Sequence, residues 1–376
     1  MKKLIPLPNS KSIIIRQLVR DFVLTGNVLP IEKDESNDVV VTYRALLSML
    51  TPAQTVIDVE DCGAAYRFLM ALLAVMPGTW VLTGTPRLLQ RPIDELVGVL
   101  RSIGAEISRV ENGWRIIGKR LSATELSVDC RKTSQYASAL LLIAPKIGLK
   151  TLHLAPASIG SVSYIQLTQL ITQEVVKIPE LPSCPSHLGG VGDWSAALFW
   201  YAKALLTPGS EYELLNLSLA SAQADSVIAK WFAEMGVVST ETAQGVLVTA
   251  KSCASARNPR VFDVADNPDV VPVMAALACL LPADFTFVHT KNLAYKESNR
   301  LTDLAEQLSR FAEVEIEEDM LRVMGRPRIC WPKPPYKFHS YHDHRLVMGF
   351  LLFDAMCCIE DTSCLRKSYP ELLNFC

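Results

Sequence analysis

The chain has 376 residues, more than one hydrophobic core usually serves, so two domains are expected. Hydrophobic residues make up 49% and charged residues 20%, which fits a compact globular protein and argues against disorder. The 37 Lys and Arg residues against 39 Asp and Glu give a net charge of −2. Because this balance gives no general attraction to nucleic acid or membranes, any anion site must be built locally.

The N-terminal segment and the later apolar runs predict neither export nor a membrane span. The apolar run that follows Lys3 ends at Pro8, which is too short for a secretion signal. The most apolar later segment, residues 271–288, is interrupted by two prolines and an aspartate. The 10 cysteines include no CxxC pair, so neither a disulfide framework nor a zinc site is indicated. We therefore expect a cytoplasmic protein.

Three segments repeat one pattern in units of roughly 60 residues. They are residues 63–118, 193–250 and 268–325. Each begins with a small-residue apolar helix, continues with a short β-rich run and an amphipathic helix, and closes with two strands. The first helices are expected at residues 64–75, 195–206 and 270–281, and the second helices at residues 95–105, 226–236 and 301–312.

Weaker copies of the pattern begin near Ser10, Gln135 and Arg345, which gives six βαβαββ-like repeats. The copy after Gln135, counted as the fourth repeat, is shortened, because only residues 172–191 separate its second helix from the next unit. Six repeats in a chain of this length predict a mixed α/β (α+β) fold of two pseudo-threefold domains with three repeats each.

The repeats also predict where ligands bind, because the start of a helix carries unpaired backbone N–H groups and the positive end of the helix dipole. Such positions favour anions. Charged and hydroxyl side chains recur at the expected helix starts. They are Lys11, Arg67, Arg91, Ser134, Ser161, Asp269, Lys296, Arg300, Arg345 and Lys367.

Five short motifs carry these residues. In chain order they are PNSKSIIIR (residues 8–16), DCGAAYR (61–67) with TGTPR and QRPI after it, NLAYKESNRL (292–301), YHDHR (341–345) and CLRKSYP (364–370). Arginine forks at helix starts suit carboxylate and phosphate groups, which they bind through two hydrogen bonds. The motifs and their order resemble the 5-enolpyruvylshikimate-3-phosphate synthase family over nearly the whole chain, from Pro8 to Pro370.

The resemblance, together with the repeats, implies the enolpyruvyl transferase type of fold. Residues 1–9 and 192–376 would form one discontinuous domain, residues 10–191 would form an inserted domain, and the active site would lie in the cleft between them. Its substrates would be two anionic small molecules, shikimate 3-phosphate and phosphoenolpyruvate. The implied pathway is the synthesis of chorismate and the aromatic amino acids.

The resemblance assigns the binding residues position by position. Those expected to hold shikimate 3-phosphate are Ser12, Arg16, Thr133, Ser134, Gln135, Ser161, Tyr164, Asp269, Asn292 and Lys296. Those expected to hold phosphoenolpyruvate are Lys11, Gly63, Arg91, Gln135, Arg300, Arg345 and Lys367. Concentrated positive charge is also what the chemistry requires, because two multiply charged anions must be brought together.

In this family, the 5-hydroxyl of shikimate 3-phosphate attacks C2 of phosphoenolpyruvate while C3 gains a proton, and the resulting tetrahedral ketal loses phosphate. The resemblance implies that Lys11 and Asp269 move the proton at the hydroxyl and the bridging oxygen. Glu297 would protonate and later deprotonate C3, with help from His344. No metal and no organic cofactor are implied, and we expect a monomer that binds neither nucleic acid nor membrane.

Some positions depart from the family pattern. Residues 61–64 read Asp-Cys-Gly-Ala where Asn-Ala-Gly-Thr is usual, which puts an acid beside the expected phosphoenolpyruvate pocket. Two alternatives stay open: a UDP-N-acetylglucosamine enolpyruvyl transferase, and a degenerate homologue without catalytic activity. The first is disfavoured because Ser12 follows Lys11 and the loop between Gly84 and Arg91 holds no cysteine. A relative of RNA 3′-phosphate cyclase is disfavoured because no basic, aromatic-rich stripe is present.

Overall fold

A computed structural model describes residues 2–33, 35–51, 54–155, 161–173, 176–181 and 187–375. The chain divides into two compact units, one formed by Met1–Ser10 with Gly189–Cys376 and the other by Lys11–Leu188. Each unit has its own hydrophobic core, and the two clusters of buried residues share no member. No helix within the described ranges is long and apolar enough to cross a membrane.

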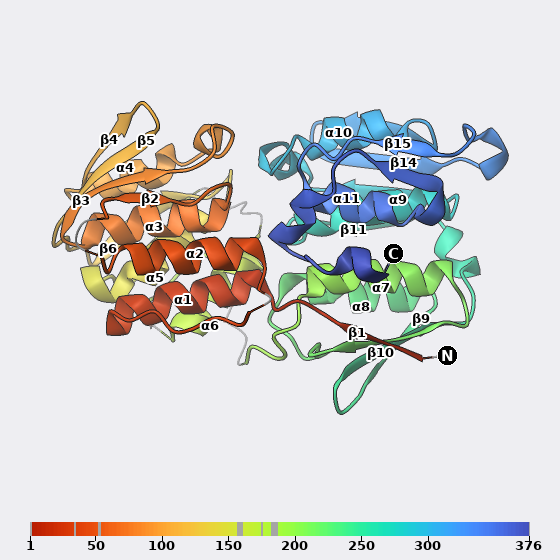
Figure 1. Ribbon diagram of the computed structural model, residues 1–376, viewed down its shortest axis with the longest axis horizontal. Helices are drawn as coiled ribbons and strands as arrows, with labels where there is room; N and C mark the ends of the chain where they lie inside the picture. The colour runs from red at the N-terminus through yellow and green to blue at the C-terminus, as the bar shows by residue number, and fades with distance from the viewer. Residues whose placement is uncertain are drawn as a thin grey trace. The chain divides into compact units, whose positions relative to one another are not determined.

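The discontinuous unit contains three sheets (Figure 1). The first has the order β1-β8-β10-β9 and the second has the order β11-β12-β14-β13. Their strands are β1 (Lys2–Pro6), β8 (Glu211–Leu215), β9 (Val237–Glu241), β10 (Gly245–Ala250), β11 (Arg260–Asp263), β12 (Asp284–Val288), β13 (Ala312–Glu317) and β14 (Met320–Gly325). The third sheet pairs β15 (Tyr336–Phe338) with β16 (Cys357–Ile359) in parallel.

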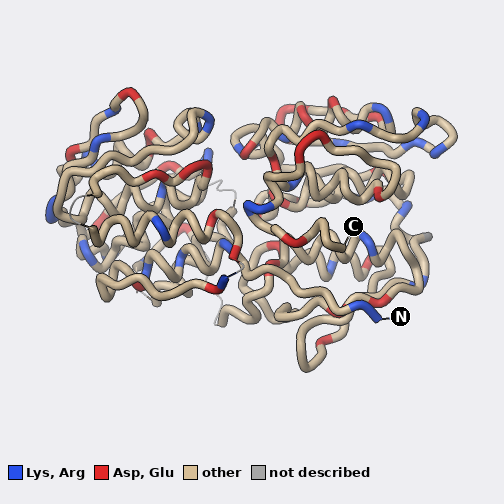
Figure 2. The backbone as a smooth tube through the Cα atoms, viewed as in Figure 1, with Lys and Arg blue, Asp and Glu red and all other residues tan. Residues whose placement is uncertain are grey.

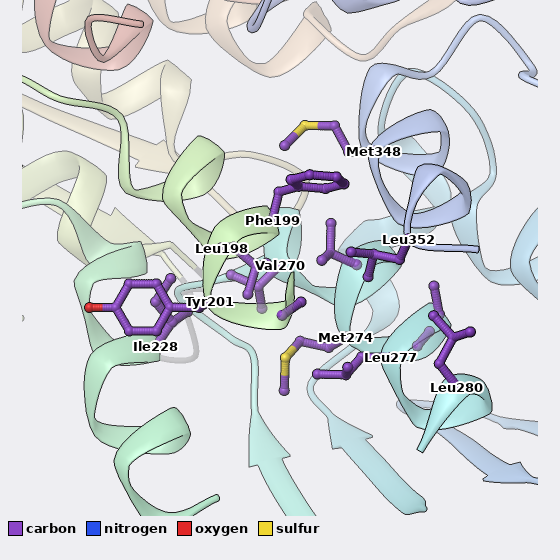
Figure 3. Packing of buried hydrophobic residues seen from close by; sticks show 14 of the residues in the cluster. Leu198, Phe199, Tyr201, Ile228, Val270, Met274, Leu277, Leu280, Met348 and Leu352 are labelled. Atoms are coloured by element: carbon purple, nitrogen blue, oxygen red, sulfur yellow. The ribbon is translucent and has the colours of Figure 1, made fainter. Parts of the chain in front are cut away.

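The helices of this unit are α7 (Trp194–Leu206), α8 (Ile228–Glu234), α9 (Val271–Leu280), α10 (Arg300–Leu308) and α11 (His344–Leu351). Every residue of α9 is buried, as expected for a helix without a polar face. Its side chains pack with those of α7 and α11, and Figure 3 shows Leu198 and Phe199 near Val270, Met274 and Leu277. Because α7, α9 and α11 pack together, the unit is built around three central helices.

The other unit has one four-stranded sheet of order β2-β3-β5-β4 and one parallel pair, β6-β7. Its strands are β2 (Val56–Asp58), β3 (Gly78–Thr83), β4 (Glu106–Val110), β5 (Gly113–Gly118), β6 (Glu125–Asp129) and β7 (Thr151–Ala155). Its helices are α1 (Lys11–Thr25), α2 (Asn37–Ser48), α3 (Gly63–Val75), α4 (Asp94–Ser102), α5 (Gln135–Ile147) and α6 (Val162–Thr172). Helices α1, α3 and α5 pack on one another, and α3 and α5 are almost entirely buried.

The predicted repeat corresponds to a shared topology. In each of the three clear copies, two parallel strands flank a buried helix, and an antiparallel hairpin completes the sheet. The three weaker copies are reduced. Helices α1 and α2 have no strand between them in the described part of the chain, and the copies with α5 and α11 each have a single parallel pair of strands. Part of residues 172–191, where the shortening was predicted, lies outside the described residues.

The first strand of one repeat comes from the opposite end of its unit's sequence. β1 pairs in parallel with β8 over five residues, from Lys2 opposite Glu211 to Pro6 opposite Leu215. The N-terminal segment therefore completes the repeat that contains α7. Beside this strand, Ser10 N donates to Val191 O at 2.7 Å and Asp193 N donates to Pro8 O at 2.9 Å, so residues 8–10 and 191–193 lie side by side.

Candidate functional site

Lys11, the first residue of α1, forms an ion pair with a buried carboxylate. Its Nζ lies 2.9 Å from Oδ2 of Asp38, which belongs to the first turn of α2. The other oxygen, Oδ1, is buried and accepts no hydrogen bond from the described residues. Asp38 was not among the predicted site residues. The charge of Lys11 is thus balanced within the unit, and an anion that binds here must compete with Asp38.

One turn later on α1, Arg16 is buried among neutral groups. Its Nε donates to Thr168 Oγ1 at 2.7 Å, its Nη1 to Ser12 O at 2.8 Å, and its Nη2 to Ser138 Oγ at 3.3 Å. Its guanidinium lies 5.7 Å from the centre of the Tyr164 ring. Burial lowers the pKa of Arg16 to about 10, so the group stays charged at neutral pH. Ser12, Arg16 and Tyr164, all predicted to bind shikimate 3-phosphate, are therefore brought together.

Two arginines, Arg67 and Arg91, meet at the start of α3 beside Gly63. A Cβ added to Gly63 would lie 2.6 Å from Arg91 Nη1 and 3.0 Å from Arg67 Nη1. Arg67 donates from Nη1 to Gly63 O at 3.1 Å and to Gln135 Oε1 at 2.8 Å, and from Nη2 to Pro92 O at 2.9 Å. Burial, followed by the charge of Arg91, lowers the pKa of Arg67 to about 10. A Cβ at this position would therefore require the ends of these two arginine side chains to shift.

This cluster joins Gly63, Arg91 and Gln135, three of the residues predicted to hold phosphoenolpyruvate. The carbonyl oxygen of the Gln135 amide is engaged by Arg67, so its amide N–H₂ is the end that can face an anion. Cys62 caps α3, since its Sγ accepts from Ala65 N at 3.4 Å. The cysteine that departs from the family pattern therefore acts as the N-cap of the helix that begins at Gly63.

The hydroxyl groups predicted for shikimate 3-phosphate stand at two further helix starts. Ser134 is the residue before α5, and Ser161 is the residue before α6, with a φ of 64°. Neither serine side chain caps its own helix. Thr133 Oγ1 accepts from Gln135 N at 3.3 Å.

In the discontinuous unit, three carboxylates surround Arg300, the first residue of α10. Its Nε lies 2.8 Å from Asp343 Oδ2, its Nη1 2.8 Å from Asp269 Oδ1, and its Nη2 3.1 Å from Glu297 Oε2. Arg300 and Asp343 are both fully buried. Burial alone would lower the pKa of Arg300, but the three carboxylates raise it above its usual value. Arg300 is therefore fully engaged by the protein itself.

Arg345, in the first turn of α11, is also buried but has weaker contacts. Its Nη2 lies 3.5 Å from Asp269 Oδ2, its Nη1 lies 3.7 Å from the sulfur of Met348, and its buried Nε has no hydrogen-bond partner among the described residues. Asp343 caps α11 by accepting from Arg345 N at 2.9 Å. A buried guanidinium with an unsatisfied donor is poised to bind an anion.

Two lysines complete this cluster. Lys296 Nζ lies 3.5 Å from Asp269 Oδ1, and the buried Lys367 has its Nζ 3.8 Å from Glu297 Oε1. Burial by itself would raise the pKa of Asp269, but Lys296, Arg300 and Arg345 hold it well below its usual range. Asp269 is therefore ionised at neutral pH and can accept hydrogen bonds.

Two predicted residues remain to be placed, His344 and Asn292. His344 follows Asp343 on α11 and is 1% exposed. Asn292, in the 3₁₀ turn Lys291–Tyr295, has a buried Oδ1 that accepts no hydrogen bond from the described residues. The other histidines of the YHDHR region face carboxylates, His339 facing Glu360 and His342 facing Asp361. The described residues contain no group of three or more side chains suited to a metal ion.

In the discontinuous unit, the predicted cations thus form one cluster with their carboxylate partners. Those of the other unit lie in separate groups at the start of α1, one turn into α1 and at the start of α3. Figure 2 shows Lys and Arg interspersed with Asp and Glu in both units. Five further residues of these groups were not assigned to a substrate or to the reaction: Asp38, Arg67, Ser138, Thr168 and Asp343. Arg67 and Asp343 lie inside two of the motifs described above, so the sequence could have indicated them. Asp38 is 27 residues from Lys11, and Thr168 is 152 residues from Arg16, so no local pattern reveals them.

Solved structures share this fold over nearly the whole chain. EPSP synthase from Acinetobacter baumannii matches with a TM-score of 0.67 and 19% identity, covering 98% of this chain and 94% of that one. The enolpyruvyl transferase NikO from Streptomyces tendae matches with a TM-score of 0.68 and 12% identity, covering 99% and 93%. The fold is therefore that of an enolpyruvyl transferase, and the predicted fold class is confirmed.

Sequence comparison identifies the family within this class. The profile of EPSP synthase (3-phosphoshikimate 1-carboxyvinyltransferase) matches residues 27–375. The 3-phosphoshikimate 1-carboxyvinyltransferases of two Bacteroides fragilis strains, ATCC 25285 and YCH46, are 32% and 33% identical, covering 98% and 100% of this chain and 93% and 94% of theirs. The chain belongs to the EPSP synthase family. The predicted enzyme class and the predicted shikimate-pathway function are confirmed, and the UDP-sugar alternative is not better supported.

Proposed function

We propose that both units contribute to one active site, at which the carboxyvinyl group of phosphoenolpyruvate is transferred to the 5-hydroxyl of shikimate 3-phosphate. The observation that carries this proposal is Arg345, a buried arginine whose Nε has no partner among the described residues and whose nearest carboxylate contact is long. The counterpart in the other unit is the pair Arg67 and Arg91 at the start of α3. One anionic group of phosphoenolpyruvate would then bind Arg345, and the other would bind Arg91.

We assign shikimate 3-phosphate to the hydroxyl-rich helix starts of the Lys11–Leu188 unit. Arg16 is held there by Thr168 and Ser138, and Ser134 and Ser161 begin the two neighbouring helices. Hydroxyl and guanidinium donors together suit a phosphate, whose oxygens are acceptors. The ring of the substrate would then reach Asp269 and Lys296 of the other unit.

The chemistry needs a base, an acid and cations. Asp269 is ionised, so it can accept the proton of the 5-hydroxyl as that oxygen bonds to C2 of phosphoenolpyruvate. Glu297 donates a proton to C3, which gives the tetrahedral ketal. The bond from C2 to the phosphate oxygen then breaks as that oxygen takes up the proton held by Asp269, and Glu297 takes a proton back from C3. The phosphate leaves with Lys11, Arg91 and Lys367 balancing its charge.

We propose a positioning role for Arg300 in place of the phosphoenolpyruvate contact that the resemblance implies. It binds Asp269, Glu297 and Asp343 at 2.8–3.1 Å, which fixes the proposed base and the proposed acid relative to each other. We therefore propose that Arg300 positions these carboxylates and that Arg345 is the main anchor for phosphoenolpyruvate in this unit. We also propose that the enzyme works in the cytoplasm as a monomer, as its small-molecule substrates require no partner.

The assignment of acid and base is tested with Glu297→Gln and Asp269→Asn. Each change keeps the size of the side chain and removes the proton transfer, so the rate of phosphate release should fall by about 10²–10⁴-fold. Asp284→Asn is the matched control, because Asp284 pairs with Arg322 on the sheet that follows α9. Equal rates for all three variants and the wild type would exclude these two roles.

A further inference from the structure

Asp225 is a buried carboxyl group that forms hydrogen bonds only with neutral groups in the described part of the chain. It lies in the 3₁₀ turn Ala224–Val227 and is 2% exposed. Its Oδ2 accepts a short hydrogen bond from Ser195 Oγ, and its Oδ1 accepts from Asn267 Nδ2 at 3.1 Å. Burying a carboxylate without a hydrogen-bonded cation is costly, so this arrangement calls for an explanation.

The two partners of Asp225 lead to the helix starts that form the anion cluster. Ser195 is in the first turn of α7, just after its N-cap Asp193. Asn267 begins the turn that carries Asp269, since Val270 N donates to Asn267 O at 3.1 Å. Asp225 thus ties the start of α7 to the start of the segment leading into α9.

The charged groups that act on Asp225 are those of the same cluster. Arg345 attracts its carboxylate, and Asp269 repels it. In turn, the charge of Arg345 is balanced by Asp269, Asp193 and Asp225. Asp269 has Lys296 and Arg300 as further cationic neighbours, whereas Asp225 has hydrogen bonds from Ser195 and Asn267 alone among the described residues.

We propose that Asp225 is a positioning residue that sets how strongly Arg345 attracts the anionic substrate. It does not touch the reacting atoms. Its negative charge competes with the substrate for Arg345, and its hydrogen bond to Asn267 holds the turn that carries Asp269. The substrate named here rests on the function proposed above, but the electrostatic role applies to any anion bound at Arg345.

The protonation of Asp225 makes this role measurable. Burial, followed by repulsion from Asp269, raises the pKa of Asp225 to about 6, although Ser195, Asn267 and Arg345 oppose the rise. Below that pH, Asp225 is neutral and Arg345 is less balanced, so it attracts an anion more strongly. Above it, Asp225 is ionised and competes with the anion. Asp225→Asn copies the neutral form at every pH and can keep both hydrogen bonds, with its Oδ1 accepting from Asn267 and its Nδ2 donating to Ser195 Oγ.

The test compares wild type, Asp225→Asn and the control Asp284→Asn between pH 5 and pH 8. The dissociation constant of inorganic phosphate is measured by calorimetry, and the KM of phosphoenolpyruvate is measured from phosphate release. The ligand's own ionisation is the same for each protein, so it cancels in the ratio of wild type to variant. For both constants, we expect the wild-type value divided by the Asp225→Asn value to rise several-fold as the pH increases through about 6. Ratios that stay constant with pH would overturn the proposal.

Thermal unfolding gives an independent readout. The folded protein raises the pKa of Asp225, so the ionised group costs stability, and this cost appears as the pH rises from about 4 to about 6. The melting temperature of Asp225→Asn relative to wild type should therefore increase over that range. A purely structural role would shift the melting temperature by the same amount at every pH, and that result would also count against the proposal.

A second variant keeps the proposal testable if Asp225→Asn folds poorly. Ser195→Ala removes a hydrogen bond that favours the ionised form of Asp225. The pH at which the dissociation constant of phosphate changes should therefore be higher in this variant than in wild type. No movement would contradict the proposal. Failure of the function proposed above is seen separately, because wild type would then release no phosphate with shikimate 3-phosphate, whereas phosphate binding and unfolding need no turnover.

Discussion

The residue at position 63 shows how closely the cationic groups approach one another. A side chain there would overlap the guanidinium of Arg91, with a Cβ-to-Nη1 distance of 2.6 Å. Gly63→Ala should therefore displace Arg91 and raise the KM of phosphoenolpyruvate by about tenfold or more, since small misplacements of binding groups are costly.

Gly98→Ala on α4 is the matched control, because a Cβ at Gly98 meets nothing within 4 Å. It should leave the KM unchanged and stabilise the protein by about 0.5–1 kcal/mol, as alanine favours a helix interior over glycine. An unchanged KM in Gly63→Ala would show that Arg91 does not bind the substrate.

Arg300 and Arg345 look equivalent in the sequence and are distinguished only by their contacts. Arg300→Gln removes a cation that three carboxylates share and leaves the buried Asp343 without its ion-pair partner, so the free energy of unfolding should fall by about 3–5 kcal/mol. Arg345→Gln removes a group with weak contacts, so it should cost much less stability and mainly raise the KM of phosphoenolpyruvate. Urea unfolding and steady-state kinetics on both variants measure the contrast. A large loss of stability in Arg345→Gln together with a raised KM in Arg300→Gln would show that the two arginines have the opposite roles.

The sequence alone does not distinguish the contacts of Arg300 from those of Arg345. Cations at helix starts were predictable, because the repeat fixes where helices begin and each helix start favours anions. Whether the protein itself neutralises such a cation depends on carboxylates that lie far away in the sequence. Asp343 is 43 residues from Arg300, and Asp38 is 27 residues from Lys11.

At the scale of elements, the three central helices of the discontinuous unit differ in how they begin. Asp193 caps α7 by accepting from Ser195 N at 2.8 Å and Ala196 N at 3.3 Å, and Asp343 caps α11. Asp193→Ala should lower the free energy of unfolding by about 0.5–2 kcal/mol, whereas Asp193→Ser should retain most of it, because serine is also a good N-cap. Chemical denaturation decides this; equal losses in both variants would mean that capping is not the contribution of Asp193.

The clear repeats were readable from sequence because their helices are apolar in long, uninterrupted runs. Residues 64–75, 195–206 and 270–281 were predicted as helices, and α3, α7 and α9 occupy these segments. The reduced copies were harder to define, because a missing strand leaves no pattern to detect. Residues between α1 and α2 carry no strand in the described part of the chain.

At the scale of the whole molecule, the two units have separate cores, yet the residues assigned to each substrate come from both. Binding of shikimate 3-phosphate should therefore draw the units together. Small-angle scattering should record a smaller radius of gyration when shikimate 3-phosphate is added, and a larger effect than with shikimate alone. No change with a saturating amount of shikimate 3-phosphate would contradict closure.

The sheet β1-β8-β10-β9 joins segments that lie far apart in the sequence. β1 carries one buried residue, Ile5, and its parallel partner β8 begins about 200 residues later, so the pairing follows from the repeat rather than from any local pattern. Because residues 8–10 run beside residues 191–193, both chain connections between the units leave the discontinuous unit at one place.

The most direct test of the proposed reaction is phosphate release from phosphoenolpyruvate, measured once with shikimate 3-phosphate and once with UDP-N-acetylglucosamine as the acceptor. The hydroxyl-lined surroundings of Arg16 and the arginines of both units predict release with shikimate 3-phosphate and none with UDP-N-acetylglucosamine. Arg345→Gln should raise the KM of phosphoenolpyruvate in the first reaction. Release with the UDP-sugar only, or with neither acceptor, would contradict the account.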